Sequence, residues 1–363
     1  MKEDPRFLSE QLITYIGNKR ALLPLIGRGV CEVLQRTGKQ KLRILDAFAG
    51  SGVVSRYFKQ FSSALYSNDL ETYSKILNTC YLSNNSEVDT AELEATRLKL
   101  ISEIEQSPSP GLLTELYAPA NDAHIHRGER VFYTHRNAVY LDTARQRISE
   151  LPQHLQPYFL APLLTQASVH TNTSGVFKGF HKNADGIGQF GGRGKNALQR
   201  ILAPISIPLP IFSRFECEYH VLQQEATAAA RTLPELNLAY LDPPYNQHPY
   251  GSNYFMLNLL AEYNRPQTMS SVSGIPKDWN RSAYNTRAKA ADSLSTLIGA
   301  ISAPHILISY NSEGFITPQE METMLARHGR VTRMQQDYAT FRGCRNLRNR
   351  PTRVNEFLYL LEK

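Results

Sequence analysis

Long apolar runs are missing from the sequence, because no stretch approaches the roughly 18 consecutive apolar residues that a membrane-spanning helix needs. Cysteines are few and far apart (Cys31, Cys80, Cys217 and Cys344), without the short spacings of zinc ligands. The first ten residues, MKEDPRFLSE, are too polar for a secretory signal peptide. These features disfavour a transmembrane, secreted, disulfide-bonded or metal-binding protein, and we expect a protein of the reducing cytoplasm.

The composition that remains is that of an ordinary globular protein with a slight excess of positive charge. Of the 363 residues, 42% are hydrophobic and 20% are charged, which is enough chain for one large core or two ordinary cores. The 40 Lys and Arg residues outnumber the 33 Asp and Glu residues, so the formal net charge is +7. By itself this excess only hints at an anionic partner.

Short apolar runs alternate with helical patterns along most of the chain. The apolar runs are typical of buried strands and cover 42–48, 64–68, 236–242, 305–310 and 356–361. The helical patterns cover 70–83, 91–106, 254–263, 286–301 and 318–328. Their alternation predicts an α/β protein with a doubly wound sheet. A β-rich stretch at 331–341 precedes the last run and predicts a terminal β-hairpin.

The middle of the chain departs from this alternation. Residues 170–200 contain seven glycines and five Lys or Arg residues but one acid, and a proline-rich stretch follows at 203–212. A long segment of this kind inside a compact enzyme is more often a functional insertion than a connector. We therefore predict a separate subdomain over 108–215, between core halves at 1–107 and 216–363.

The sequence LDAFAGSG, from Leu45 to Gly52, predicts a strand that ends in a glycine-rich turn and leads into a helix. Such a turn lets the backbone approach a nucleotide-type ligand at the helix N-terminus. A P-loop is excluded, because no Lys-Ser/Thr pair follows the turn. About 20 residues further on, Asp69 ends the next strand, where an acid can accept hydrogen bonds from ribose hydroxyls, with Glu71 as a substitute. The alternatives are a purely structural turn and an ordinary helix N-cap.

The tetrapeptide Asp242-Pro243-Pro244-Tyr245 begins at the last residue of the predicted strand at 236–242. The two prolines lack N–H groups and have restricted backbones, so they end the strand and hold the neighbouring carbonyls in a rigid turn. An acid, acceptor carbonyls and an aromatic ring then meet at the sheet edge where open α/β folds bind ligands. A plain structural turn is the alternative.

These motifs resemble the S-adenosylmethionine-dependent methyltransferases that act on exocyclic amino groups, and DPPY resembles the DNA adenine-N6 enzymes among them. The segment Tyr15–Arg20, YIGNKR, is similar to the motif that opens the Dam-like (D12 class, alpha-group) branch, whose motif order this chain follows. The extended DPPYNQHPYGSNYF and the late ISYNSEGFI look like type II restriction–modification relatives. The resemblance covers both ends of the chain closely and 108–215 only loosely. It implies a Rossmann-like methyltransferase sheet with an inserted DNA-recognition subdomain.

The resemblance also implies which residues hold S-adenosylmethionine. The cofactor-binding residues would be Tyr15, Gly17, Asn18, Lys19, Asp46, Phe48, Gly50, Ser51, Gly52 and Asp69. Glu225 stands where the family often places an Asp near the cofactor adenine. By the same resemblance 1–107 is the cofactor-binding half, 108–215 the target-recognition insertion and 216–363 the catalytic half.

The DPPY residues would act on the adenine amino group. The N6 lone pair is delocalised into the ring, and hydrogen bonds from N6 to Asp242 and to the Pro243 carbonyl would make it a better nucleophile. Tyr245 would stack on a base that has been flipped out of double-stranded DNA, and Pro244 would complete the catalytic set. No covalent intermediate is required, and none of the four cysteines lies in a Pro-Cys context.

Two basic segments are candidates for DNA contact. The first holds Lys178, Lys182, Arg193 and Lys195, and the second is an arginine run that includes Arg342, Arg345 and Arg348. Residues 265–290 form a third candidate, a loop over the flipped base with Arg281 and Tyr284 as contacts. The alternatives are a solvated basic hairpin for the arginine run and a surface connector for 265–290.

The leading hypothesis is a site-specific DNA adenine-N6 methyltransferase of a restriction–modification system. It would have a cognate restriction endonuclease and no obligate protein partner. An RNA adenine-N6 methyltransferase and a catalytically inactive DNA-binding relative stay open as alternatives. Methylation of a protein glutamine is disfavoured, because the motif of the protein-glutamine methyltransferases resembles NPPY, whereas this chain has DPPY. A dinucleotide oxidoreductase is disfavoured by the single GxG and by the DPPY turn.

Overall fold

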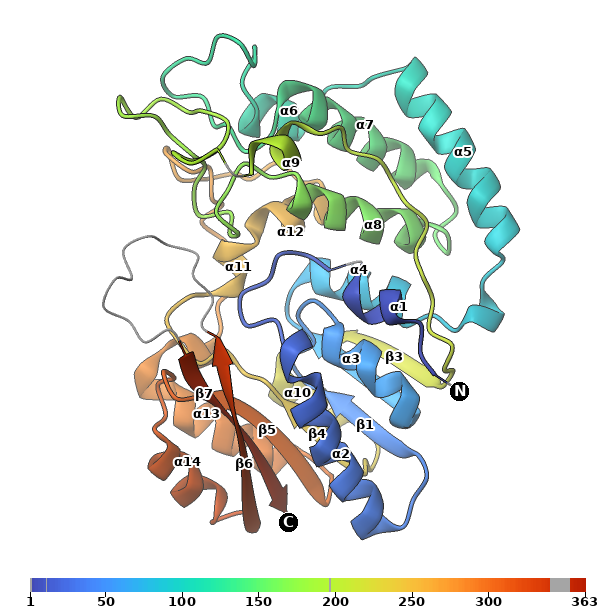
Figure 1. Cartoon of the computed structure of the whole chain (residues 1–363), viewed down its shortest axis with the longest axis vertical. Coiled ribbons are helices and arrows are strands. Elements are labelled where there is room, and N and C mark those ends of the chain that lie inside the picture. Colours follow the sequence, from blue (N-terminus) through green and yellow to red (C-terminus); the bar gives the residue numbers. More distant parts are fainter. Residues whose placement is uncertain (1, 11, 196, 340–352) are drawn as a thin grey trace.

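The computed structural model describes the whole chain except residues 1, 11, 196 and 340–352, and it contains a seven-stranded sheet (Figure 1). The strands are β1 (Leu42–Asp46), β2 (Ser62–Asp69), β3 (Glu218–Gln223), β4 (Leu238–Leu241), β5 (His305–Asn311), β6 (Arg330–Ala339) and β7 (Arg353–Glu362). Their order is β3-β2-β1-β4-β5-β7-β6, with β1 to β5 parallel. β7 runs antiparallel to β5, and β6 antiparallel to β7. The predicted α/β sheet and terminal β-hairpin are confirmed.

Apolar side chains on both faces explain why the central strands appear as unbroken apolar runs. Successive residues of a strand point to opposite faces. In β4, Leu238 and Tyr240 pack with α2 (Leu23–Thr37) and α3 (Val53–Phe58). Ala239 and Leu241 face the other way, toward α10 (Ala226–Thr232), α13 (Arg287–Ala300) and α14 (Pro318–Leu325). The sheet is therefore covered by helices on both faces.

A helical layer lies beyond one end of the sheet, above it in Figure 1. One apolar core joins its helices α4 (Thr72–Tyr81), α5 (Thr90–Gln106), α6 (Leu112–Tyr117), α7 (His135–Glu150), α8 (Gln156–Val169) and α12 (Phe255–Glu262). The shorter helices are α1 (Pro5–Ser9), α9 (Leu198–Leu202) and α11 (Tyr250–Asn253). Three members of this core, α4, α5 and α12, lie outside residues 108–215.

The five predicted helices are confirmed within a few residues as α4, α5, α12, α13 and α14. Strand β3 is a correction, because it was not among the predicted strands. Its sequence EYHVLQ is mostly polar and it lies at the sheet edge, where half of its residues are exposed. The structure also adds α6, α7, α8 and α9 within 108–215.

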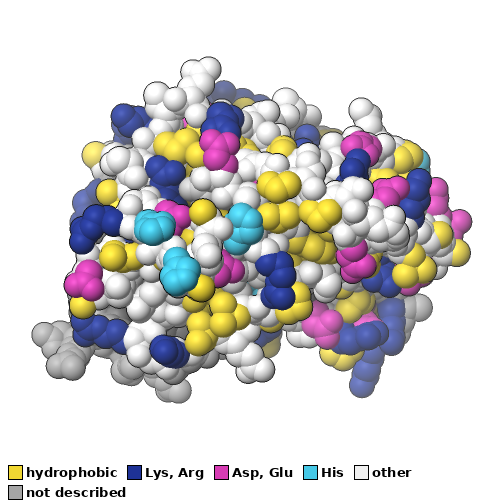
Figure 2. Space-filling model, turned by 90° about the horizontal axis from the view of Figure 1, so that it is seen from above, with side chains coloured by type: hydrophobic (Ala, Val, Ile, Leu, Met, Phe, Trp, Pro, Cys, Tyr) yellow, Lys and Arg dark blue, Asp and Glu magenta, His cyan; other side chains and the backbone are white. Residues whose placement is uncertain are grey.

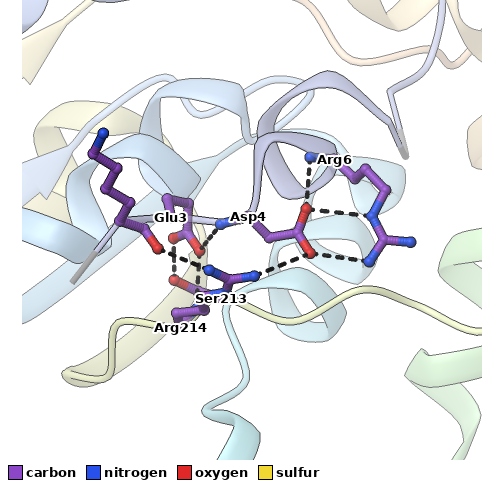
Figure 3. Close-up of polar contacts among 6 residues, drawn as sticks. Glu3, Asp4, Arg6, Ser213 and Arg214 are labelled. Carbon is purple, nitrogen blue, oxygen red and sulfur yellow. Dashed lines mark hydrogen bonds and ion pairs between the residues drawn. The ribbon is translucent and has the colours of Figure 1, made fainter.

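The chain segment that returns from the helical layer is tied to the N-terminus (Figure 3). The Glu3 carboxylate accepts hydrogen bonds from the hydroxyl of Ser213 and from the backbone N–H of Arg214, the latter at 2.9 Å. The Asp4 carboxylate caps α1 by accepting from the backbone N–H of Arg6 at 2.9 Å. These contacts fix the point at which the chain re-enters the sheet through β3. Among the helices that the structure describes, none combines the length and the apolar character needed to span a bilayer.

Candidate active site

A cavity of about 580 Å³ opens at the carboxyl ends of the parallel strands, within the range of roughly 300–1,000 Å³ typical of small-molecule sites. Its wall combines segments that are far apart in the sequence. They are 15–19, 47–51, the end of β2 at 68–71, 224–227, the DPPY turn, and 280–285. Of the predicted site residues, the cavity wall includes Tyr15, Gly17, Asn18, Lys19, Phe48, Gly50, Ser51, Asp69, Glu225, Asp242, Pro244 and Arg281.

The N-terminal motif is held by tyrosines that follow the DPPY turn. The ring of Tyr15 stacks on the rings of Tyr250 and Tyr254, with centroid distances of 5.0 Å and 4.8 Å. The backbone N–H of Ile16 donates to the Tyr254 hydroxyl at 2.7 Å, and the Tyr250 hydroxyl donates to the Ile16 carbonyl at 3.1 Å. Residues 250–254 therefore fix residues 15–19 against the sheet edge, and with them the position of Lys19.

The glycine-rich turn after β1 is fastened to the end of β2. The backbone N–H of Gly50 donates to Asp69 Oδ2 at 2.8 Å, while the N–H of Glu71 donates to Asp69 Oδ1 at 3.0 Å. Burial raises the pKa of Asp69, and these backbone hydrogen bonds oppose the rise. The Asp69 carboxylate thus shapes the turn itself, and a carboxylate has room for further donors.

Both the backbone conformation and the close packing at position 50 require glycine. Its φ of +53° lies in the left-handed region that other residues adopt at a cost. A Cβ atom at this position would lie 2.8 Å from a ring carbon of Tyr15. The turn can therefore approach the N-terminal motif only because residue 50 has no side chain.

Glu71 lines the cavity beside Asp69 and is almost fully buried, with 4% of its surface exposed. Its Oε2 atom accepts hydrogen bonds from the amides of Asn258 at 2.5 Å and Asn280 at 3.1 Å. Burial raises the pKa of Glu71 to about 7, and the Asp69 carboxylate adds to the rise. Two acids at the end of β2 thus face the same cavity.

Asp46 and Gly52 stabilise the turn from outside the cavity wall. The buried Asp46 carboxylate accepts a hydrogen bond from the Ser55 hydroxyl at 2.6 Å, and Ser55 also pairs with the Ser67 hydroxyl at 2.9 Å. Burial raises the pKa of Asp46 to about 7. Gly52, with φ of +77°, is the N-cap of α3 and lies against Asn78.

Lys19 connects the DPPY aspartate with a buried acid of the last strand. Its Nζ atom lies 3.1 Å from Asp242 Oδ1 and 2.8 Å from Glu356 Oε1, and 3% of the residue is exposed. Burial opposes the charge of Lys19, but the two carboxylates hold its pKa well above the usual value. Burial raises the pKa of Asp242 to about 6, with Lys19 lowering it and Glu356 raising it.

Glu356 was absent from the predicted site. The available signal was an acid next to the apolar run FLYLL, in a strand that proved to be buried. An acid in such a place is rarely buried without a partner. Its partner, Lys19, is 337 residues away in the chain, so the sequence alone could not pair them.

The aromatic residue of DPPY lies beside the same lysine. Lys19 Nζ lies 5.5 Å from the centroid of the Tyr245 ring, and that ring meets Tyr310 edge-on at 6.0 Å. The Tyr245 carbonyl accepts a hydrogen bond from the Phe315 N–H at 2.9 Å. Pro244 lines the cavity, with Pro243 between it and Asp242. The turn is thus held by contacts from both β5 and the loop after it.

Aromatic and polar groups from other segments also line the cavity. Phe48 meets Tyr284 edge-on at 5.2 Å. The Glu225 carboxylate caps α10 by accepting from the Ala228 N–H at 3.0 Å, and it also lines the cavity. The Arg281 guanidinium stacks on the ring of Trp279 at 4.4 Å.

The predicted DNA-contact residues of the insertion are exposed on the segment between α8 and α9: Lys178, Lys182, Arg193 and Lys195. Figure 2 shows that basic, acidic and histidine side chains are interspersed on the upper face of the helical layer. The buried Asn172 fastens this segment, since its amide donates to the carbonyls of Val131 at 2.7 Å and Gln189 at 2.9 Å. Arg342, Arg345 and Arg348 lie outside the described residues.

Comparison with known proteins agrees with this arrangement. The D12 class N6 adenine-specific DNA methyltransferase family model matches residues 15–324. The type II methyltransferase M.NlaIII of Neisseria lactamica is 28% identical over 361 residues, which cover 97% of this chain and 99% of that protein. M.CviAII of Paramecium bursaria Chlorella virus 1 is 27% identical, covering 91% of this chain and 93% of that protein. The modification methylase StsI of Streptococcus sanguinis is 29% identical, over 86% of this chain and 46% of that protein.

The matched region begins at Tyr15 and contains the glycine-rich turn, Asp69 and the DPPY turn, which are the segments that meet at the cavity. It spans far more than half of the 363 residues. The resemblance inferred from the motifs is therefore confirmed, and with it the prediction of a DNA-modifying enzyme that uses a methyl donor. This chain belongs to the D12 class of N6 adenine-specific DNA methyltransferases.

Proposed function

We propose that this enzyme transfers a methyl group from S-adenosylmethionine to N6 of an adenine flipped out of double-stranded DNA. The observation that carries the proposal is the single cavity shared by Asp242, Asp69 and the glycine-rich turn. A base amino group at Asp242 and a methyl donor at the turn would then meet in one enclosed space. Holding two reactants in contact in this way supplies much of the rate enhancement.

The residues around the turn fit S-adenosylmethionine. Asp69 and Glu71 offer carboxylate oxygens that suit ribose hydroxyls and the cationic groups of the cofactor, and Phe48 offers an apolar face. The missing side chain of Gly50 lets the turn lie against the Tyr15 ring, so that both groups line the cavity. When bound, the cofactor supplies an electrophilic methyl group. Tyr15, Ser51 and Glu225 would complete its binding site, with Asp46 and Gly52 supporting the turn from behind.

Asp242 would act as the hydrogen-bond acceptor for the amino group. Its side chain keeps 18% of its surface exposed, and Lys19 pairs with the Oδ1 atom. The Pro243 carbonyl would accept the second N6–H, and the Tyr245 ring would stack on the base. When both N–H groups of one amino group donate hydrogen bonds, the nitrogen becomes more tetrahedral. Its lone pair is then free to attack the methyl group.

A flipped base requires a surface that grips the DNA backbone. We assign this role to the exposed Lys178, Lys182, Arg193 and Lys195, and to Arg281 at the cavity mouth. The arginine run at Arg342, Arg345 and Arg348 is proposed for the same role. The similarity to the type II methyltransferases M.NlaIII and M.CviAII supports a place in a restriction–modification system with a cognate endonuclease.

The direct test offers S-adenosylmethionine with a tritiated methyl group together with double-stranded DNA and RNA of matched sequence. We expect label in the DNA, recovered as N6-methyladenine after digestion to nucleosides. Label in RNA alone, or on a base other than adenine, would refute the proposal. Sequencing of DNA from cells that express the enzyme, by a method sensitive to N6-methyladenine, would then identify the target sequence.

Gly50→Ala is expected to weaken S-adenosylmethionine binding by at least about tenfold. The new Cβ would displace the Tyr15 ring, which lies 2.8 Å away, and the left-handed backbone adds a cost of about 1–2 kcal/mol. Isothermal titration of the cofactor measures the change in Kd.

Gly38→Ala is the matched control for this substitution. Gly38 has a similar φ of +65° at the end of α2, but nothing lies within 4 Å of its added Cβ. It should lower the free energy of unfolding by the backbone cost and leave the Kd of the cofactor unchanged. If both variants change the Kd of the cofactor equally, the turn does not belong to the cofactor site.

A further inference from the structure

The carboxylate of Glu356 lies next to the DPPY site but belongs to none of its motifs. It is 2% exposed, and its position on β7 is set by pairing with β5, where Glu356 stands opposite Asn311. Its Oε1 atom accepts hydrogen bonds from Lys19 Nζ at 2.8 Å and from the Ser309 hydroxyl at 3.0 Å. The last strand of the sheet therefore contributes an ordered acid to the catalytic region.

The ammonium group of Lys19 is shared between two carboxylates. Its distance to Glu356 Oε1, 2.8 Å, is shorter than its distance to Asp242 Oδ1, 3.1 Å. With Lys19 charged and both acids ionised, the cluster carries a net charge of −1. A lysine paired with Asp242 alone would form a neutral ion pair, and Asp242 would be a weaker hydrogen-bond acceptor for an incoming amino group.

We propose that Glu356 is a positioning residue for methyl transfer, which holds Lys19 and keeps Asp242 electron-rich enough to accept a hydrogen bond from the adenine amino group. This inference rests on the role proposed above for Asp242. Glu356 acts through Lys19 and does not itself contact the base or the cofactor. Ser309 fixes the Glu356 carboxylate in turn, so the chain of contacts runs from β5 and β7 to the DPPY turn.

The ionisable groups around Asp242 come from several elements. Lys19 approaches from the N-terminal motif, Glu356 from β7, Tyr240 from β4, Asp46 from β1, and Tyr245 and Tyr250 from the DPPY turn and α11. Burial raises the pKa values of Tyr240 and Tyr250 well above their usual value, so these two hydroxyls stay protonated near neutral pH. Asp46 and Glu71, each with a pKa of about 7, are the acids whose titration has to be separated from that of Asp242.

Glu356→Gln tests the proposal, because glutamine keeps the shape of the side chain and can still accept from Lys19 and Ser309. We expect kcat to fall by about tenfold while the KM values for DNA and cofactor change by less than about threefold. Activity should require ionised Asp242, so the acid limb of the pH–rate profile should follow its pKa. Loss of the Glu356 charge should move that limb to lower pH, whereas Glu356→Asp, which keeps the charge, should restore the limb toward its wild-type position.

Two controls separate this role from simple support of the fold. Ser309→Ala removes a hydrogen bond to Glu356 but no charge, so it should leave the acid limb in place and reduce kcat only a few-fold. The Glu356→Gln shift should persist in an Asp46→Asn background and in a Glu71→Gln background, which remove the two other acids whose pKa is raised to about 7. A shift that disappears in either background would overturn the proposal, because the limb would then belong to Asp46 or to Glu71.

A Glu356→Gln enzyme with unchanged kcat and an unmoved acid limb would also overturn the proposal. So would a lower kcat with an unmoved limb, since that result describes a structural role alone. An active Asp242→Ala enzyme would instead refute the function proposed for Asp242. An inactive Asp242→Ala enzyme beside a wild-type-like Glu356→Gln enzyme would leave that function standing and refute the role of Glu356.

Discussion

Asp242→Ala is expected to lower the rate of methyl transfer by about 10²- to 10³-fold, the usual effect of deleting one hydrogen-bonding group that acts on the reacting atoms. The physical reason is the loss of the carboxylate acceptor that would bind the adenine amino group in the cavity. Affinity for DNA should change little, because phosphate contacts supply most of it and the proposed basic residues are untouched. Single-turnover transfer of a tritiated methyl group and a DNA-binding titration measure the two quantities separately.

The fold should survive this substitution. Lys19 keeps its contact with Glu356 at 2.8 Å, so no buried cation is left without a partner. Asp337→Ala, at an exposed acid of β6, is the matched control and should leave both rate and affinity unchanged. Full activity of Asp242→Ala would show that another group accepts the amino protons, and the catalytic assignment would have to be abandoned.

Lys19→Met is expected to lower the free energy of unfolding by about 3–5 kcal/mol at neutral pH and to abolish methyl transfer. The substitution leaves Asp242 and the buried Glu356 close together without the cation that lies between them. Two carboxylates in such surroundings favour the protonated form, because burial and mutual repulsion both disfavour the charged form. Urea denaturation at several pH values measures the loss.

The pH dependence of this loss has a definite sign. Burial already raises the pKa of Asp242 to about 6 in the folded wild type, and removal of Lys19 raises it further. An acid whose pKa is higher in the folded state than in the unfolded state stabilises the fold at low pH and loses that contribution as pH rises. The loss in the free energy of unfolding should therefore be smallest below about pH 4, the usual carboxyl range. It should grow as the pH rises from there to about pH 8.

Lys59→Met provides a control at a second buried lysine. Lys59 Nζ donates to the carbonyls of Leu82 at 2.6 Å and Ser83 at 3.2 Å, and to Asn84 Oδ1 at 3.0 Å. Its removal leaves no pair of buried carboxylates, so the extra loss of stability with rising pH should be missing and activity should persist. If both methionine variants show the same pH dependence, the effect does not come from the Asp242–Glu356 pair.

The central strands and the main helices were predictable from the sequence, because local patterns encode them. A parallel strand covered on both faces appears as an apolar run, and the strands β1, β4 and β5 satisfy this rule. The edge strand β3 does not, since its exposed side chains are polar and it forms through pairing with β2. Strand pairing joins distant segments, and no local pattern reports it.

The positions of the site motifs also followed from the sequence. The glycine-rich turn, Asp69 and the DPPY turn each follow a predicted strand, and parallel strands bring their carboxyl ends to one edge of the sheet. The individual residues of the turn were assigned through the resemblance to the methyltransferase family. The contacts of each side chain did not follow from the sequence. Asp69 accepts a hydrogen bond from the turn, and Asp46 accepts one from Ser55.

The sequence by itself determined the fold class, the family and the residues that meet at the cavity, because strand ends and turn glycines depend on neighbours within a few positions. Only the tertiary structure decided how these residues are supported. It stacked Tyr15 on Tyr250 and Tyr254, and it joined Lys19 to Glu356 across 337 positions of the chain. An ion pair depends on distance in space, and the course of the chain through the whole sheet sets that distance.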